Sequence, residues 1–234
     1  MENICWNITH KCNRYCKHCF RDANEKDLLI DENIKILYDL ISIGIKKITW
    51  SGGEPTEYEG IDKLLRIAKE NGVYNKLVTN ASNFIEKNDY CIFNYIDEVI
   101  FSIDTVDDRL NEEIGRGTDY FQHIKEVIKI LKSDYPNCCI SVNTIVMRPT
   151  IDYIDDVYRE INKIGIKKWK LIQFCSFRGV AILNKRLFEV TSEEYSDIVN
   201  RYRILSNNFE FAWHTSKQVE KEHILVSSSG KIIE

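Results

Sequence analysis

Three cysteines near the N-terminus have the spacing of a metal-binding loop. Cys12, Cys16 and Cys19 form the pattern CxxxCxxC. Thiolates are soft ligands that suit an iron–sulfur cluster or zinc. Three ligands are one fewer than the usual four. An iron–sulfur cluster on this loop would therefore keep one iron open to a group that the protein does not supply.

A second short segment, Ser51-Gly52-Gly53-Glu54-Pro55, follows a predicted strand. Two adjacent glycines let the backbone approach a ligand closely. Their carbonyl groups, together with the carboxylate of Glu54, would suit an ammonium group. Taken alone, the segment favours a plain turn, and it gains weight only beside the three cysteines.

These two segments belong to a chain in which β-rich runs alternate with amphipathic runs. Strands are predicted at residues 4–9, 47–50, 76–79, 98–103, 140–146 and 168–174. Helices are predicted at residues 31–44, 61–70, 84–93, 120–133 and 154–164, with Asp31 as the N-cap of the first. Right-handed crossovers place such strands in parallel. Six units fall short of the eight in a closed barrel, so we expect an α/β fold that is either a partial (β/α)6 barrel or a doubly wound sheet.

The C-terminal part of the chain does not continue the alternation of predicted strands and helices. We expect residues 1–180 to form the core and residues 181–234 a short α+β extension packed on its open side. A helix is predicted at residues 192–205, and short strands at 209–213, 224–227 and 231–233.

Composition excludes several classes of protein. The 234 residues carry a net charge of −4, so no nucleic-acid partner is expected. No apolar run approaches the roughly 20 residues that span a bilayer, and residues 1–3 lead directly into a strand with no signal peptide. We therefore expect a cytoplasmic protein whose clustered cysteines bind metal rather than form disulfides.

Polar side chains follow the predicted strands one after another. Loops after parallel strands meet at one edge of the sheet, where sites are built. Besides the cysteine loop and the Ser51–Pro55 segment, this edge should hold Asn80, Ser102, Asp104, Asn143, Arg148, Lys170 and Cys175.

With Phe20 directly after the third cysteine, the CxxxCxxC and Gly-Gly-Glu-Pro segments together resemble the radical S-adenosylmethionine (SAM) superfamily. The resemblance spans residues 4–175. It implies a four-iron, four-sulfur cluster on the three cysteines, with SAM chelated to the open iron and cleaved to a 5′-deoxyadenosyl radical. It further implies that SAM is contacted by Phe20, Ser51, Gly52, Gly53, Glu54, Asn80, Ser102, Asp104 and Arg116. An electron donor such as flavodoxin or ferredoxin would then be a partner.

A closer resemblance points to the viperin family, antiviral enzymes that dehydrate a nucleoside triphosphate. Residues 111–117 (NEEIGRG), 142–148 (VNTIVMR) and 168–173 (KWKLIQ) carry it. It implies that Arg116 contacts the carboxylate of SAM and that the substrate is bound by Lys47, Asn143, Arg148 and Lys170. It also makes Lys170, Cys175 and His223 candidate catalytic residues. Two positions depart from the family pattern: Ser141 replaces a lysine and His223 replaces a tyrosine.

Two other functions remain open from the sequence. One is a radical enzyme that modifies a peptide or another metabolite, such as a pterin. The other is a non-catalytic iron–sulfur or zinc module that senses redox state. For zinc, Cys5, His10 or His18 would be the available fourth ligand.

Overall fold

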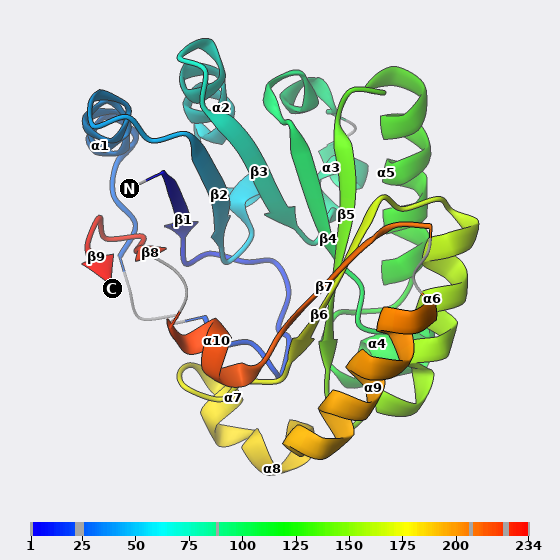
Figure 1. The fold of residues 1–234 in the computed structure, drawn as a ribbon. Coiled ribbons are helices and arrows are strands. Elements are labelled where there is room, and N and C mark those ends of the chain that lie inside the picture. The colour runs from blue at the N-terminus through cyan, green and yellow to red at the C-terminus, as the bar shows by residue number, and fades with distance from the viewer. Residues whose placement is uncertain (1, 22–25, 88, 206–207, 222–224, 234) are drawn as a thin grey trace.

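One curved sheet contains all nine strands found in the computed structural model, which describes residues 2–21, 26–87, 89–205, 208–221 and 225–233. The strand order is β7-β6-β5-β4-β3-β2-β1-β8-β9 (Figure 1). The strands β1 to β7 follow one another in parallel, at Asn3–Thr9, Lys47–Gly52, Tyr74–Thr79, Glu98–Ser102, Cys139–Val146, Lys168–Gln173 and Glu210–His214. The six predicted strands are confirmed, in the predicted parallel arrangement.

Helices α1, α2, α5, α6 and α9 surround the outside of the curved sheet (Figure 1). They span Ile30–Ser42, Ile61–Glu70, Tyr120–Asp134, Ile154–Lys163 and Ser192–Leu205. Shorter helices α3, α4, α7, α8 and α10 span Ser82–Lys87, Asp108–Glu113, Val180–Leu183, Lys185–Phe188 and Ser216–Lys221. Three 3₁₀ turns, η1 to η3, lie at Pro55–Glu57, Cys91–Tyr95 and Ile151–Tyr153. This arrangement is a partial barrel, not a doubly wound sheet.

Strand periodicity gives the sheet an apolar outer face, packed against the helices, and an inner face on which polar and apolar residues are mixed. In β1, Ile4, Trp6 and Ile8 are buried in the main core, and Trp6 stacks on Trp50 of β2 with ring centroids 5.2 Å apart. The alternate residues of a strand point to the opposite face. That inner face carries residues such as Lys47 and Lys170, which line a cavity.

The C-terminal residues add strands to both edges of the sheet. β7 pairs in parallel with β6, whereas β8 (Leu225–Val226) pairs in parallel with β1 at the other edge. β9 (Ile232–Ile233) then pairs antiparallel with β8. The predicted strands near residues 209–213, 224–227 and 231–233 are therefore present, and the barrel stays open between β7 and β9. The division of the chain at residue 180 stays a prediction.

Two predicted helix boundaries were wrong. α1 begins at Ile30, and its N-cap is Leu29, whose N–H donates to the carboxylate of Glu32 (2.8 Å), so Asp31 is not the cap. The predicted helix at 84–93 is instead α3 followed by η2. The rings of Phe84 and Phe93 lie 4.6 Å apart. In one continuous helix, residues nine positions apart would be separated by about 13 Å along the axis.

No helix in the described ranges has the length and apolar character needed to cross a membrane.

Candidate active site

The three cysteines lie on the loop that follows β1. All three are free thiols and half-buried. The backbone N–H of Arg14 donates to Sγ of Cys12, and that of Arg21 donates to Sγ of Cys19, both at 3.4 Å. Hydrogen bonds from amides to sulfur stabilise thiolates and tune iron–sulfur clusters. The local backbone therefore fits soft-metal ligation.

When no metal is bound, burial disfavours the thiolate forms of Cys12 and Cys16. It raises the pKa of Cys12 to about 11, and it also raises the pKa of Cys16. Metal binding must therefore release protons. In the described part of the chain, no three His, Cys, Asp or Glu side chains are arranged as a metal site. The donor chemistry of the three free thiols fits an iron–sulfur cluster.

Gly52 and Gly53 bring the β2 loop against the cysteine loop. The N–H of Gly53 donates to the carbonyl of Thr9 (2.7 Å), and the N–H of Glu54 donates to the carbonyl of Lys11 (2.8 Å). A Cβ atom on Gly53 would lie 1.9 Å from the Lys11 oxygen. Gly52 has a φ of +130°, and its Cβ would lie 2.3 Å from the Thr9 oxygen. The two glycines are thus required for the contact between the two loops, in addition to any ligand.

Glu54 connects the same loop to the end of β3. Its carboxylate is buried and accepts hydrogen bonds from the hydroxyl of Thr79 (2.8 Å), the N–H of Asn80 (2.7 Å) and the hydroxyl of Thr56 (2.7 Å). Burial raises the pKa of Glu54, although these hydrogen bonds oppose the shift. The structure thus gives Glu54 a role in positioning loops, and its contact with SAM stays a prediction.

Amide side chains extend this network to the cysteines. Nδ2 of Asn80 donates to Oδ1 of Asn13 (3.0 Å) and lies 3.8 Å from Sγ of Cys12.

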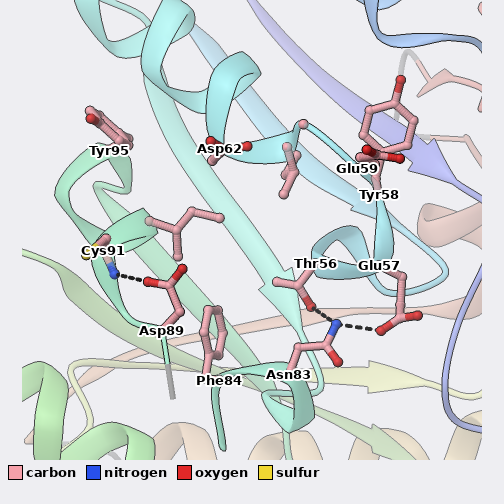
Figure 2. Close-up of a pocket in the computed structure, with 13 residues that line it drawn as sticks. Thr56, Glu57, Tyr58, Glu59, Asp62, Asn83, Phe84, Asp89, Cys91 and Tyr95 are labelled. Carbon is pink, nitrogen blue, oxygen red and sulfur yellow. Dashed lines mark hydrogen bonds between the residues drawn. The ribbon is translucent and has the colours of Figure 1, made fainter. Parts of the chain in front are cut away.

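Figure 2 shows Asn83 donating to Thr56 and Glu57, at 3.0 Å and 2.5 Å, beside a separate cavity of about 500 Å³. None of the predicted site residues lines that cavity.

Arg116 and Asp104 form a buried ion pair behind the cysteine loop. Nε of Arg116 donates to Oδ2 of Asp104 at 2.7 Å, and the two residues are 5% and 0% exposed. Oδ1 of Asp104 also accepts from the N–H of Ile145 (2.9 Å). Although burial alone would raise it, the pKa of Asp104 is held well below its usual range, chiefly by the charge of Arg116. Arg116 therefore faces Asp104 in this structure, and its contact with SAM stays a prediction.

His18 and Tyr120 complete this buried cluster. Nε2 of His18 lies 3.4 Å from Oδ2 of Asp104, and Nη1 of Arg116 donates to the hydroxyl of Tyr120 (3.2 Å). The Tyr120 hydroxyl in turn donates to the carbonyl of Ser102 (2.7 Å). Because His18 lies between Cys16 and Cys19, the cluster ties the cysteine loop to β4 and α5. Burial lowers the pKa of His18.

The inner face of the barrel encloses a cavity of about 520 Å³, here called the inner cavity. It brings together residues predicted for cofactor and substrate, namely Phe20, Ser51, Ser102, Lys47, Asn143 and Lys170. Phe20 stacks on Phe177 with ring centroids 5.3 Å apart, and the guanidinium of Arg178 lies over Phe20 at 5.5 Å. The cavity thus has an aromatic wall next to the cysteine loop and lysines deeper along the strands.

Other predicted residues lie elsewhere. Arg148 forms two hydrogen bonds of 2.7 Å with Glu194, and neither Arg148 nor Cys175 lines the inner cavity. Sγ of Cys175 lies 3.9 Å from the carbonyl of Ser216. His223 lies outside the described residues. The roles proposed for these three residues stay predictions.

Sequence analysis missed Lys76, Glu98 and His214 on the inner face. Lys76 and Glu98 lie next to the buried Leu77 and Val99 in β3 and β4, and His214 is the last residue of β7. A residue's place in the two-residue strand period was the signal that could have found them. Tyr120 was missed for a different reason, since its position in α5 indicates only a buried helix face.

Replacing Gly53 with alanine should separate the two loops. The added methyl group collides with backbone atoms that cannot rotate away, so we expect less iron bound per chain after anaerobic reconstitution. Gly72→Ala is the control, because Gly72 has nothing within 4 Å of its Cβ position. Because Gly72 has a positive φ, Gly72→Ala should lower the free energy of unfolding by about 1 kcal/mol, but it should bind as much iron as wild type. Equal iron content in Gly53→Ala and wild type would contradict the role assigned to this contact.

Asp104→Asn should destabilise the fold by about 3–5 kcal/mol in urea unfolding, because it leaves the buried Arg116 charge without its partner. The matched control is Asp156→Asn, which removes an exposed ion pair with Arg159 and should cost about 0–1 kcal/mol. Since the pKa of Asp104 is lowered in the folded state, its contribution is present above about pH 4 and is lost as the pH falls. The difference in free energy of unfolding between wild type and Asp104→Asn should therefore decrease as the pH is lowered. A difference that increases would contradict the charge pairing.

Comparisons with known proteins agree with this geometry. The family model of the Radical SAM superfamily matches residues 6–161. The chain is 24% identical over 252 aligned positions to an S-adenosylmethionine-dependent nucleotide dehydratase of Lacinutrix mariniflava, covering 100% of this chain and 50% of that protein. It is 25% identical to a protein of the same name from Flammeovirga pacifica, covering 99% of this chain and 81% of the other. The chain thus spans about half the length of the first relative.

Among solved structures, Streptococcus suis SuiB bound to S-adenosylmethionine superposes with a TM-score of 0.77. The sequence identity is 16%, and the match covers 99% of this chain and 59% of SuiB. At this identity the likeness concerns the fold. The superfamily's cofactors are a four-iron, four-sulfur cluster and SAM, which agrees with the three thiols and the adjoining cavity. Since the family model matches well over half of the residues, the chain belongs to the radical SAM superfamily.

Proposed function

We propose that this radical SAM enzyme abstracts hydrogen from a small phosphorylated substrate held in the inner cavity, and that its reaction is the dehydration of a nucleoside triphosphate. The observation that carries the proposal is the shared cavity, where lysines of β2 and β6 and the amide of β5 lie together with residues expected to contact SAM. The names of the curated relatives support the same reaction class.

The residues around the cysteine loop would hold the cofactors. Cys12, Cys16 and Cys19 would ligate the cluster, with Asn80 beside Cys12 and the amide donors of Arg14 and Arg21 supporting the sulfurs. When bound, the cluster and SAM together supply an electron and a carbon radical for hydrogen abstraction. The protein's own task is to position both and to exclude water. Phe20 and Phe177 form an apolar wall suited to that exclusion.

The lysines would bind the phosphate chain. Lys47 and Lys170 line the inner cavity with Asn143, so ammonium groups and an amide donor face the same space. Ammonium groups pair well with phosphate oxygens. Lys47 also lies 5.6 Å from the Tyr74 ring centre, a contact that keeps its stem along the sheet. The nucleoside would then lie toward the rim, near Ser102 and Phe20.

A second candidate is modification of a peptide. It is favoured by a TM-score of 0.78 to Streptococcus suis SuiB bound to its precursor peptide SuiA, at 14% identity. The lysines on the inner face favour a phosphorylated substrate instead. In either case an electron donor, such as a flavodoxin or ferredoxin, would be needed.

Anaerobic reconstitution should give about four irons per chain and reductive cleavage of SAM to 5′-deoxyadenosine, measured by chromatography. Cys16→Ala should lose both, while Cys91→Ala, which changes an exposed cysteine in η2, should keep both. Full cleavage by Cys16→Ala would exclude the cluster assignment.

Incubation with each nucleoside triphosphate in turn should then yield one product lighter by one water molecule, detected by mass spectrometry. Lys170→Met should lower the yield at least tenfold, because it removes an ammonium group from the phosphate site. If cleavage of SAM proceeds and every nucleotide keeps its mass, the nucleotide assignment fails and the peptide candidate takes its place.

A further inference from the structure

The inner cavity continues into a second cavity of about 190 Å³ at the opposite end of the strands, here called the floor. The two cavities share Lys76, Ile100, Asn143, Lys170 and His214. A carboxylate lies in this floor. Glu98 of β4 is 2% exposed and accepts a hydrogen bond from the hydroxyl of Ser141 (2.6 Å). The floor is therefore a built polar site and not a gap between strands.

Two lysines share the Glu98 carboxylate. Nζ of Lys76 lies 2.8 Å and Nζ of Lys168 lies 3.4 Å from Oε2 of Glu98. Lys168 also lies 3.8 Å from Glu210, but that carboxylate is 69% exposed and its charge is screened by solvent. Burial would raise the pKa of Glu98, but the hydrogen bonds of Lys76 and Ser141 and the charges of both lysines outweigh it and lower the pKa. The carboxylate is therefore charged at neutral pH.

The floor lies far enough from the rim to bind the distal end of an elongated substrate. Glu98 precedes Ser102 by four residues on β4. A strand rises about 3.3 Å per residue, so these two positions are about 13 Å apart along the strand. A substrate that reacts near Ser102 and reaches Lys76 must carry its anionic group at one end.

We propose that Glu98 is a specificity-determining residue that competes with the substrate's terminal phosphoryl group for Lys76 and Lys168 and so limits the negative charge the barrel accepts. The inference rests on the proposed function, since it takes the substrate to be phosphorylated. An incoming phosphate gains two ammonium partners and meets one fixed negative charge. The carboxylate offsets part of the attraction of the two ammonium groups, and this offset increases with the charge of the ligand, so each added phosphoryl group gains less affinity than it would beside an uncharged residue 98.

The test is equilibrium binding of inorganic phosphate, pyrophosphate and tripolyphosphate to the full chain by calorimetry at low ionic strength. Glu98→Gln keeps the side-chain volume and an acceptor for Ser141 but removes the charge. We expect it to bind tripolyphosphate about tenfold more tightly than wild type, with a smaller gain for phosphate. Glu189→Gln is the control, because it removes the same charge from an exposed position on the C-terminal side of α8. Equal or weaker tripolyphosphate binding by Glu98→Gln would overturn the inference.

Lys76→Met provides an independent variant, since it leaves Glu98 with Ser141 and Lys168. It should weaken tripolyphosphate binding about tenfold, and unchanged binding would overturn the inference. The two proposals can fail separately. If the protein cleaves SAM and dehydrates a nucleotide but Glu98→Gln leaves anion binding unchanged, only the role of Glu98 is contradicted. If both variants change tripolyphosphate binding as expected but no nucleotide is dehydrated, only the proposed reaction is contradicted.

Discussion

The backbone contact between the cysteine loop and the Gly52–Gly53 turn determines the rest of the site. Two hydrogen bonds hold the loop after β1 against the loop after β2, at 2.7 Å and 2.8 Å, with no room for a side chain between them. From there Glu54 carries the constraint to the end of β3 through Thr79 and Asn80. Three neighbouring strand ends are thereby fixed relative to the thiols. A cluster held on one loop can serve a cavity formed by all strands only if that loop has a fixed position.

The buried Asp104–Arg116 pair holds the cysteine loop from the other side. A buried ion pair contributes little net stability over apolar packing, but removing one partner costs several kcal/mol. Its effect here is to impose a geometry, because His18, Tyr120 and the amide of Ile145 all orient toward the same two side chains. Lys17 adds a backbone hydrogen bond to the carbonyl of Ile114 (3.0 Å) in the same region. The loop is thus held between β2 on one side and the β4–α5 region on the other.

The period of the hydrophobic pattern explains which features could be predicted from the sequence. β5 and β6 were visible because one face of each must be apolar against the outer helices, and the same alternation places Asn143 and Lys170 on the inner face. The cysteine and Gly-Gly-Glu-Pro segments were visible because their spacing is local. The division between α3 and η2 was not visible, because the packing of Phe84 on Phe93 is a tertiary contact. The pairing of Arg116 with Asp104 likewise depends on two segments meeting in space.

The chemical character of the side chains on the inner face changes from the rim to the floor. Near the rim, the stacked rings of Phe20 and Phe177 form an apolar wall next to the cysteine loop, which suits the exclusion of water from radical chemistry. Near the floor, lysines and a buried carboxylate form a charged site whose strength depends on low local dielectric. Along β4, Glu98 in the floor is separated from Ser102 by about 13 Å of strand. If Glu98 has the role proposed for it, a change of this one inward residue would alter substrate selection without disturbing the cysteine loop. A sheet with a two-residue period permits this, because an inward substitution leaves the outer core packing of Val99 and Phe101 intact.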